Sequence, residues 1–400
     1  MSQVPIIDVL TTVFIGLVTA TIVALVRRYR ASVLSAIGNG LARLPKVMTR
    51  SAPSALTLPG EQRDLVTVEK RLEYLRGLKR PRYLILGGIY LDIQVTPVSA
   101  TTFDGSEHDD LDRVELSCGG SARYVGMYLN QIYGVRSELY TRLGKDDRLS
   151  RELRKLLKKE RWIRRRRFQD DDTLQSGVSI QLFHRQDPHH TTLTYKGALS
   201  ALAWNHRSLR QLKNSAAGGG IMHISGYFRT GLHAGLSRSL RELSAGLLVC
   251  VDHGSFVPRD HDNASAALLQ AFADKLVDVY ICTQAELHTL MLMAKLNHDP
   301  TLPLERQLEA YASGSVLPRI TIVQPEPAGG LARAHIILDD EVTAVDVAIA
   351  PGAWQYIPGR SNAFNASLMH ALVHNQERAF LRETLTIAVA EALGAWANLG

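Results

Sequence analysis

The chain has 400 residues, of which 46% are hydrophobic and 21% are charged, and this balance favours a folded globular body over a disordered or fibrous chain. Its length fits two or three domains, or one large domain with extensions. Three cysteines without paired spacing argue against a disulfide framework and favour a reducing compartment. No metal-ligand spacing and no internal repeat are found, so no metal is expected.

The N-terminal 30 residues predict a membrane anchor with a basic flank. Val9–Val26 carries no charge, and its 18 residues would span about 27 Å as a helix, close to the hydrocarbon core of about 30 Å. The positive charges, Arg27–Arg30, follow this run, whereas a cleaved signal peptide has them before it. By the positive-inside rule the body then lies on the cytoplasmic or matrix side, of a bacterial plasma membrane or a mitochondrial inner membrane.

Residues 31–79 predict two helices joined by a linker. Ala31–Leu44 has the spacing of a short amphipathic helix, and Pro45 would end it. Thr49–Gly60 is a Ser/Pro/Ala linker. Val66–Leu78 is expected to form a helix that carries Val68, Leu72 and Leu75. It is expected to pack on its own body, and the alternative is that it reaches a partner protein.

Residues 80–400 show a series of apolar strands that end in glycine turns, as in a mostly parallel sheet. The segments that carry this pattern are Tyr83–Asp92, Cys118–Arg123, Leu143–Asp147, Ser176–Val178, Tyr195–Ala198, His223–Tyr227 and Val249–Asp252. Near the C-terminus, Pro358–Ala366 is a glycine turn that opens an apolar helical run, which is the layout of an anion cradle at a helix N-terminus.

In their order and spacing these segments resemble the signatures of the PfkB (ribokinase-like) sugar and nucleoside kinases. The resemblance implies an α/β fold, a three-layer α/β/α sandwich, with a small β lid at Gln94–Leu116 and Ile180–Tyr195. It also implies one cleft beyond the carboxyl ends of the strands. Asp92, Gly119 and Gly120 would bind the substrate there.

The resemblance breaks at the residues that carry the chemistry. Asn362 stands where the family has its catalytic Asp, and a neutral amide cannot take a proton from an attacking hydroxyl. The anion hole would be Gly359, Arg360 and Ser361, with Ser361 in place of the central glycine. Arg123 stands at the position of a substrate-side Asn.

Two further departures concern the nucleotide. Thr283 replaces the Asn of the magnesium motif, of which Glu286 is kept. The phosphate loop is matched by Gln324–Gly329, in which Gly329 is kept as a cofactor-binding residue. The carboxylate of Glu326 would repel phosphate, and the two prolines in this segment have no backbone N–H to donate.

The basic block Arg151–Arg167 is expected on the helix that follows Leu143–Asp147. It is a solvated helix face, or it binds anionic lipid or an acidic protein. Nucleic acid is not favoured, because no aromatic side chains are interleaved with the charges.

The sequence therefore predicts a membrane-anchored pseudokinase that serves as an accessory subunit of a membrane complex and needs no cofactor. One alternative is an active membrane-bound sugar or nucleoside kinase that uses Mg-ATP, with Asp92, Glu286 or a metal-bound water as the base and Arg360 near the phosphate. The other is a sugar- or nucleoside-binding sensor without catalysis.

Overall fold

The computed structural model describes residues 66–98, 113–184, 190–243, 245–254, 262–296, 302–314, 316–328, 330–349, 359–374 and 381–398. The predicted anchor Val9–Val26, its flank Arg27–Arg30 and the helix predicted at Ala31–Leu44 lie outside these ranges. Within them, no helix has the length and apolar character needed to span a bilayer. The chain divides into two compact units, of which the smaller includes residues 92–117 and 180–192.

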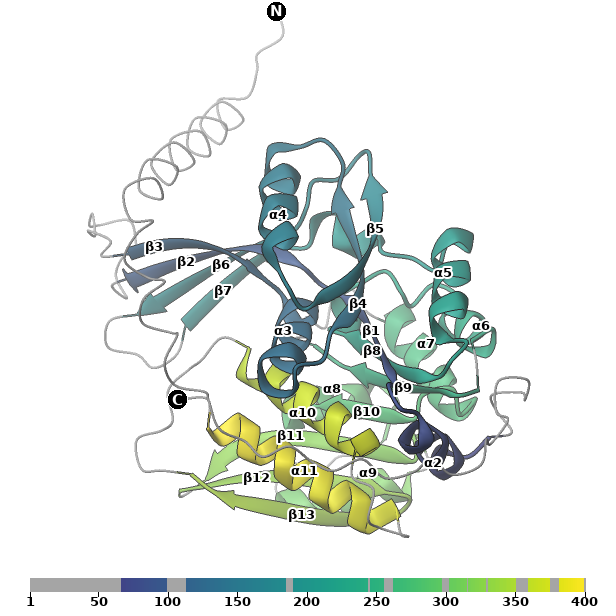
Figure 1. Cartoon of the computed structure of the whole chain (residues 1–400). Coiled ribbons are helices and arrows are strands. Elements are labelled where there is room, and N and C mark those ends of the chain that lie inside the picture. The colour runs from purple at the N-terminus through teal and green to yellow at the C-terminus, as the bar shows by residue number, and fades with distance from the viewer. Residues whose placement is uncertain are drawn as a thin grey trace, which may run out of the picture. The chain divides into compact units, whose positions relative to one another are not determined.

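The larger unit is built on a sheet of nine strands (Figure 1). In sheet order these are β13 (Glu341–Ala348), β12 (Leu331–Leu338), β11 (Ile320–Ala328), β10 (Val279–Cys282), β9 (Leu247–Asp252), β8 (Gly220–Ser225), β1 (Arg82–Gly87), β4 (Ser137–Gly144) and β5 (Ile163–Asp171). Strands β11 to β5 pair in parallel, and β12 and β13 add an antiparallel end. The central strands are buried along their whole length, which explains their continuous apolar sequences.

Helices cover both faces of this sheet. One face packs against α2 (Val68–Gly77), α3 (Ser121–Tyr133), α4 (Arg148–Lys159), α10 (Arg360–His374) and α11 (Leu381–Ala397). The other packs against α5 (His206–Ala216), α6 (Leu236–Arg241), α7 (Asp262–Ala273), α8 (Gln284–Met293) and α9 (Leu304–Ser313). Two short 3-10 helices, Gly197–Ala201 and Tyr227–Arg229, follow β7 (His190–Tyr195) and β8. The three-layer α/β/α prediction is confirmed.

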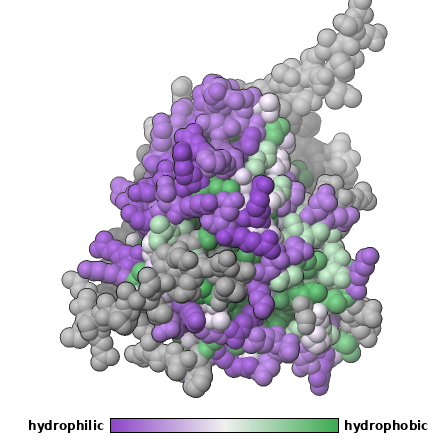
Figure 2. Space-filling view, turned by 90° about the vertical axis from the view of Figure 1, so that its right-hand side faces the viewer, coloured by the Kyte–Doolittle hydropathy of each residue, from purple (hydrophilic) through white to green (hydrophobic). Residues whose placement is uncertain are grey.

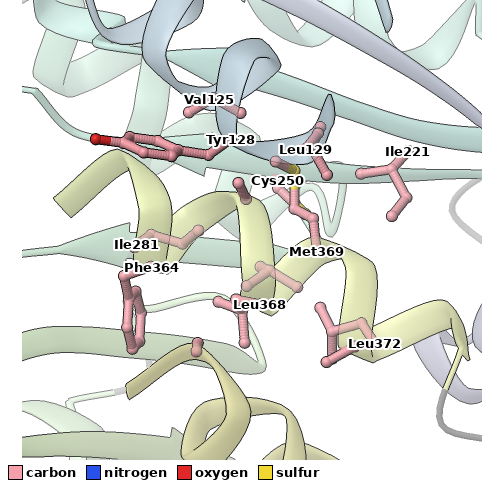
Figure 3. Close-up of a cluster of buried hydrophobic side chains, with 14 of the residues drawn as sticks. Val125, Tyr128, Leu129, Ile221, Cys250, Ile281, Phe364, Leu368, Met369 and Leu372 are labelled. Atoms are coloured by element: carbon pink, nitrogen blue, oxygen red, sulfur yellow. The ribbon is translucent and has the colours of Figure 1, made fainter. Parts of the chain in front are cut away.

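The core beneath α3 and α10 holds these two helices in fixed positions on the sheet. Figure 3 shows their apolar side chains against residues of three central strands: Val125, Leu129, Leu368, Met369, Ile221, Cys250 and Ile281. Each of these side chains is at most 1% exposed. Because the N-terminal turns of both helices carry predicted site residues, this packing also positions the site.

Helix α2 belongs to the body, as its apolar spacing predicted. Leu72 and Leu75 are 2% and 0% exposed. Arg71, which is 1% exposed, forms an ion pair with Asp278 and donates from Nε to the carbonyl of Ala245 at 3.0 Å. A buried guanidinium needs such partners, since an unpaired buried charge is strongly destabilising.

The smaller unit contains most of a four-stranded sheet in the order β3-β2-β6-β7. Strand β7 was given above, and the remaining three strands of this sheet are β2 (Tyr90–Val98), β3 (Arg113–Gly119) and β6 (Val178–His184). This is the small β sheet that the sequence predicted from the segments 94–116 and 180–195.

The prediction that Arg151–Arg167 lies on one helix was wrong. Helix α4 ends at Lys159, and the four consecutive arginines Arg164–Arg167 lie in β5, the last strand of the nine-stranded sheet. The chain leaves the helix because Trp162 and Ile163, both 2% exposed, reach the core by an extended path. The Trp162 ring packs directly on Gly126 of α3. A Cβ added at Gly126 would lie only 2.2 Å from the nearest atom of that ring.

Candidate functional site

The glycine turns at the carboxyl edge of the sheet are made by close backbone contacts. Gly120 precedes α3 with φ of +98°, and a Cβ there would lie 2.4 Å from the carbonyl oxygen of Gly88, which follows β1. Neither the dihedral angle nor the contact admits a side chain. The end of β1 and the start of α3 therefore meet backbone to backbone, and Gly119 is the last residue of β3.

The turn before α10 meets the same helix. Gly359 has φ of +83°, and a Cβ there would lie 2.6 Å from the ring of Tyr124 in α3. Its carbonyl oxygen accepts from the backbone N–H groups of Asn362 at 2.9 Å and Ala363 at 3.0 Å. Within the larger unit, the turn at Gly119–Gly120 and the turn at Gly359–Asn362 are thus brought together around α3.

Asn362 lies in the first turn of α10 and is half-buried, and Ser361 before it is exposed. The helix begins at Arg360, so Asn362 does not occupy the N-cap position. Its side chain offers an amide, which can donate and accept hydrogen bonds but cannot act as a base.

The two arginines of the predicted site are held in other contacts. Arg360 is 6% exposed, and its guanidinium carbon lies 5.1 Å from the ring centre of Trp396 in α11. Burial lowers the pKa of Arg360. Arg123 donates from Nε to Glu160 at 3.0 Å and from Nη2 at 2.9 Å. Arg360 thereby joins α10 to α11, and Arg123 joins α3 to the end of α4.

A largely buried polar cluster lies between the end of β9 and the middle of β11, and Glu286 is its one member that the sequence analysis predicted as a site residue. We call Asp252, Glu286, Gln324 and Asn365 the polar cluster. Asp252 ends β9, is 6% exposed and accepts from the N–H of Gly226 at 3.2 Å. Gln324 donates to Oδ1 of Asn365 at 2.7 Å, which ties β11 to α10 one turn after Asn362.

The two carboxyl groups of the polar cluster resist ionisation. Burial raises the pKa of Asp252 to about 7, and the charge of Glu286 adds to the rise. The N–H of Gly226, the side chain of Asn365 and the charge of Arg229 act in the opposite direction. Burial also raises the pKa of Glu286. A carboxyl group that titrates near neutrality can exchange a proton or neutralise a cation, and this is the chemistry that the cluster offers.

Glu286 also has a structural task. Its carboxylate accepts from the N–H of Thr283 at 2.8 Å, and its own N–H donates to the Thr283 hydroxyl at 3.2 Å. This reciprocal pair is a capping box that starts α8. Thr283 is thus explained by helix capping. Among the described residues, no group of three or more His, Cys, Asp or Glu side chains is arranged to hold a metal ion.

The predicted phosphate loop is a strand as far as it is described. Residues 324–328 continue β11, and Glu326 and Pro327 pair with Arg333 and Ala332 of β12 after a register shift. A segment in an antiparallel ladder directs backbone groups to its neighbour, so it does not form a cradle of free N–H donors. The expectation of a loop at these residues was wrong. Gly329 lies outside the described residues.

Asp92, the predicted substrate-side carboxylate, belongs to the smaller unit. It is 1% exposed, and its Oδ2 accepts from Nε2 of Gln181 in β6 at 3.3 Å. Within this unit Asp92 therefore joins β2 to β6.

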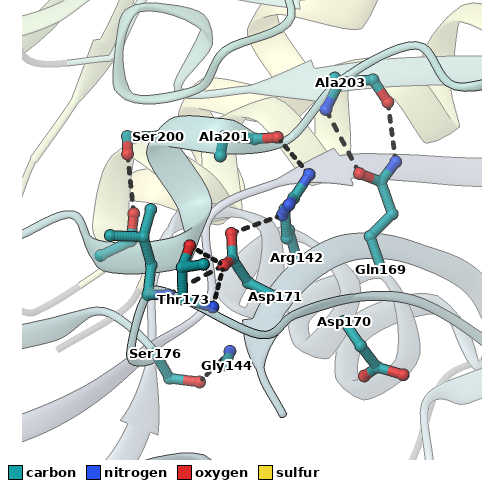
Figure 4. A network of polar contacts seen from close by, with 12 residues as sticks. Arg142, Gly144, Gln169, Asp170, Asp171, Thr173, Ser176, Ser200, Ala201 and Ala203 are labelled. Carbon is teal, nitrogen blue, oxygen red and sulfur yellow. Dashed lines mark hydrogen bonds and ion pairs between the residues drawn. The ribbon is translucent and has the colours of Figure 1, made fainter.

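The segment Leu143–Asp147 is fixed by the polar network of Figure 4. Asp171 accepts from Nε of Arg142 at 2.9 Å and from the N–H of Leu174 at 2.8 Å. Burial alone would raise the pKa of Asp171, but hydrogen bonds from the backbone of Leu174 and Thr173 and the charge of Arg142 lower it to about 2. At its end, Asp147 caps α4 by accepting from the N–H of Ser150 at 2.9 Å.

No family model matches the chain, and no curated protein matches it. Solved structures do. Adenosine kinase from Anopheles gambiae, in complex with P1,P4-di(adenosine-5) tetraphosphate, has a TM-score of 0.60 at 16% identity over 80% of this chain and 95% of its own. Adenosine kinase from Trypanosoma brucei brucei has a TM-score of 0.60 at 15% identity, over 80% and 98%. Ribokinase from Arabidopsis thaliana, complexed with ribose and ATP, has a TM-score of 0.54 at 17% identity, over 78% and 92%. At such identities the likeness concerns the fold.

Proposed function

We propose that this chain, which has the PfkB (ribokinase-like) fold, is a pseudokinase that is tethered to a membrane as an accessory subunit of a membrane protein complex. The observation that carries the loss of activity is Asn362. Asn362 lies in the first turn of α10, directly after the glycine turn that resembles the anion hole of the kinases. Transfer of a phosphoryl group to a hydroxyl needs a base at this position, and Asn362 supplies an amide.

The nucleotide side supports the same proposal. Thr283 is used to cap α8, and residues 326–328 pair with β12. Arg360 packs on Trp396. Phosphoryl transfer depends mostly on positioning and charge neutralisation, and these segments supply few groups for either. We therefore expect no cofactor to bind.

The membrane part of the proposal rests on the sequence. The uncharged run Val9–Val26 and the basic cluster Arg27–Arg30 favour a single-pass anchor with the body on the cytoplasmic or matrix side. A bacterial plasma membrane and a mitochondrial inner membrane fit this orientation. The partners would be the bilayer and other subunits of the complex.

An active sugar or nucleoside kinase is the second candidate, and the polar cluster is the observation that favours it. Asp252 has a pKa of about 7, and a group with this pKa can accept a hydroxyl proton near neutral pH. In that case the γ-phosphoryl group of ATP would pass to the substrate oxygen, with Mg-ATP held near Glu286. A sugar- or nucleoside-binding sensor without catalysis is the third candidate.

Thermal unfolding with and without millimolar Mg-ATP tests the proposal. Any ligand at about 100 times its dissociation constant stabilises a protein by about 2.7 kcal/mol, so a functional nucleotide site would be visible. We expect no shift in melting temperature beyond that caused by magnesium alone. A clear rise with Mg-ATP that Glu286→Gln abolishes would favour the active kinase instead.

A further inference from the structure

Five cationic side chains gather where α4 ends and β5 begins. Lys158, Lys159, Arg161, Arg164 and Arg166 fall within nine residues, and all five are exposed. We call them the basic corner. Figure 2 shows the side of the larger unit that carries β5 and α5 in Figure 1, and its upper part is predominantly hydrophilic.

The basic corner has no acidic partner among the described residues. Glu160 is the single carboxylate within the segment, and both of its oxygens are used elsewhere. Oε1 accepts from Arg123, and Oε2 accepts from the indole N–H of Trp162 at 2.8 Å. Arg166 donates to the carbonyl of Leu157 at 3.0 Å, which is a neutral acceptor.

Neighbouring cations that stabilise the fold have acidic partners, and this contrast sets the corner apart. Arg165 lies 3.7 Å from the buried carboxylate of Glu138, and Arg154 forms an ion pair with Asp170. The C-terminus of α4 favours positive charge, but one capping guanidinium such as Arg166 satisfies its last carbonyls. Edge strands are commonly protected by charge as well. Neither capping of the helix nor protection of the edge strand requires five clustered cations, since like charges repel one another.

We propose that the basic corner binds the phosphate headgroups of an anionic bilayer surface, an inference that rests on the membrane tether proposed above. Guanidinium and ammonium groups both bind phosphate oxygens. Arg27–Arg30 and the corner would then face the same leaflet. The Ser/Pro/Ala linker that the sequence predicts at Thr49–Gly60 would let the body turn its corner to the membrane.

Nucleic acid fits the corner less well than lipid does. Binding of single strands uses aromatic faces for stacking, and Trp162 is 2% exposed. Phe168 is half-buried, and the guanidinium carbon of Arg154 lies 5.7 Å from its ring centre. The corner thus offers charge without stacking surfaces, which suits a field of headgroups.

The binding is expected to be weak per residue and to depend on salt. Each Lys or Arg near an anionic surface contributes a factor of about five in affinity. A tether raises the local concentration of the surface, so a modest intrinsic affinity suffices. At about 0.5 M salt the Debye length falls to a few ångströms and the contact should be lost.

The experiment uses the full chain reconstituted in lipid nanodiscs, either neutral or containing about 30% phosphatidylserine. A donor dye is attached at Gln131→Cys, an exposed and uncharged position of α3 outside the basic corner, and energy transfer to an acceptor on the lipid headgroups is measured. The three native cysteines, Cys118, Cys250 and Cys282, are buried, so the introduced thiol is the one that reacts. We expect higher transfer in the anionic discs than in the neutral ones.

The charge variant is Lys158→Gln/Arg161→Gln/Arg164→Gln, which spares the capping Arg166. It should lower the equilibrium constant of docking about 100-fold. The matched control Arg207→Gln/Arg210→Gln/Arg238→Gln removes three exposed cations from α5 and α6 and should leave docking unchanged. Equal transfer in neutral and anionic discs, or equal losses in both variants, would overturn the inference.

Failure of the tether can be told apart from failure of the corner. Retention of the chain in neutral discs reports on the tether alone, because the corner has no anionic lipid to bind there. If the chain is not retained, co-sedimentation with free phosphatidylserine vesicles tests the corner with the same two variants. Sedimentation that the charge variant loses and the control keeps supports the inference, and no sedimentation contradicts it.

Discussion

The two turns that meet at α3 differ in what their residues must do. At Gly120 the backbone angle and the 2.4 Å approach to Gly88 exclude any side chain, so glycine is required by the fold alone. At the start of α10, Gly359 is required in the same way, whereas Asn362, three residues later, meets no such steric limit. Fold geometry fixes the first kind of residue, and only chemistry fixes the second.

This contrast extends to the other matched segments. Leu143–Asp147 resembles the kinases and is explained by capping and by the Asp171 network. Thr283 departs from them and is explained by capping as well. A chain can therefore keep the ribokinase-like fold while polar residues in the segments that resemble the kinase motifs take up structural tasks. Three experiments can break or sharpen this distinction.

The largest effect is expected for Gly120→Ala. The new Cβ would meet the backbone carbonyl of Gly88, and φ of +98° is unfavourable for alanine, so the free energy of unfolding should fall by about 3 kcal/mol or more. Gly394→Ala is the control, because it lies within α11 with nothing within 4 Å of its Cβ. That variant should be more stable by about 0.5–1 kcal/mol. Urea unfolding of both measures the difference, and equal stabilities would refute the steric account.

A smaller effect is expected for Asp252→Asn, and it should depend on pH. Since burial raises the pKa of Asp252 to about 7, the folded chain keeps a proton that the unfolded chain releases near pH 4. The wild type should therefore lose stability as the pH rises from about 4 to 7, and the variant should lose less, because only Glu286 of the two buried carboxyl groups remains. At pH 8 we expect the variant to be more stable by about 1–3 kcal/mol.

The measurement is the melting temperature from pH 4 to pH 8 for the wild type, for Asp252→Asn and for the surface control Asp340→Asn. The control should follow the wild type. Parallel curves for the wild type and Asp252→Asn would show that the carboxyl group is not strained by its burial.

Much of the fold was accessible from the sequence because strands and glycine turns have strong local causes. The buried runs Leu84–Leu86 and Leu247–Val251 are continuous and apolar, as parallel strands must be. The prediction of a helix at Arg164–Arg167 was wrong because four consecutive arginines show no alternation of apolar and polar residues that would indicate a strand. Its extended path is decided by the burial of Trp162 and Ile163, which is a tertiary effect.

The polar cluster could not be recognised from one segment, because its members come from β9, α8, β11 and α10. Glu286 was predicted as a cofactor-binding residue, and the further signals were Asp252 at a strand end and Asn365 three residues after Asn362. The strand at residues 324–328 was missed for a related reason. Two prolines disfavour a central strand, and the register shift between Val323 and Glu326 leaves one of them, Pro325, outside the pairing with β12.

The central claim is that the chain cannot transfer a phosphoryl group, and turnover by the wild type beside Asn362→Asp tests it most directly. A panel of sugars and nucleosides with Mg-ATP would serve as substrates. We expect no turnover by either protein, because a restored base still lacks a positioned phosphoryl donor. The substitution should change stability by no more than about 0.5 kcal/mol. Robust turnover by the variant would show that the nucleotide side is intact, and robust turnover by the wild type would contradict the pseudokinase account.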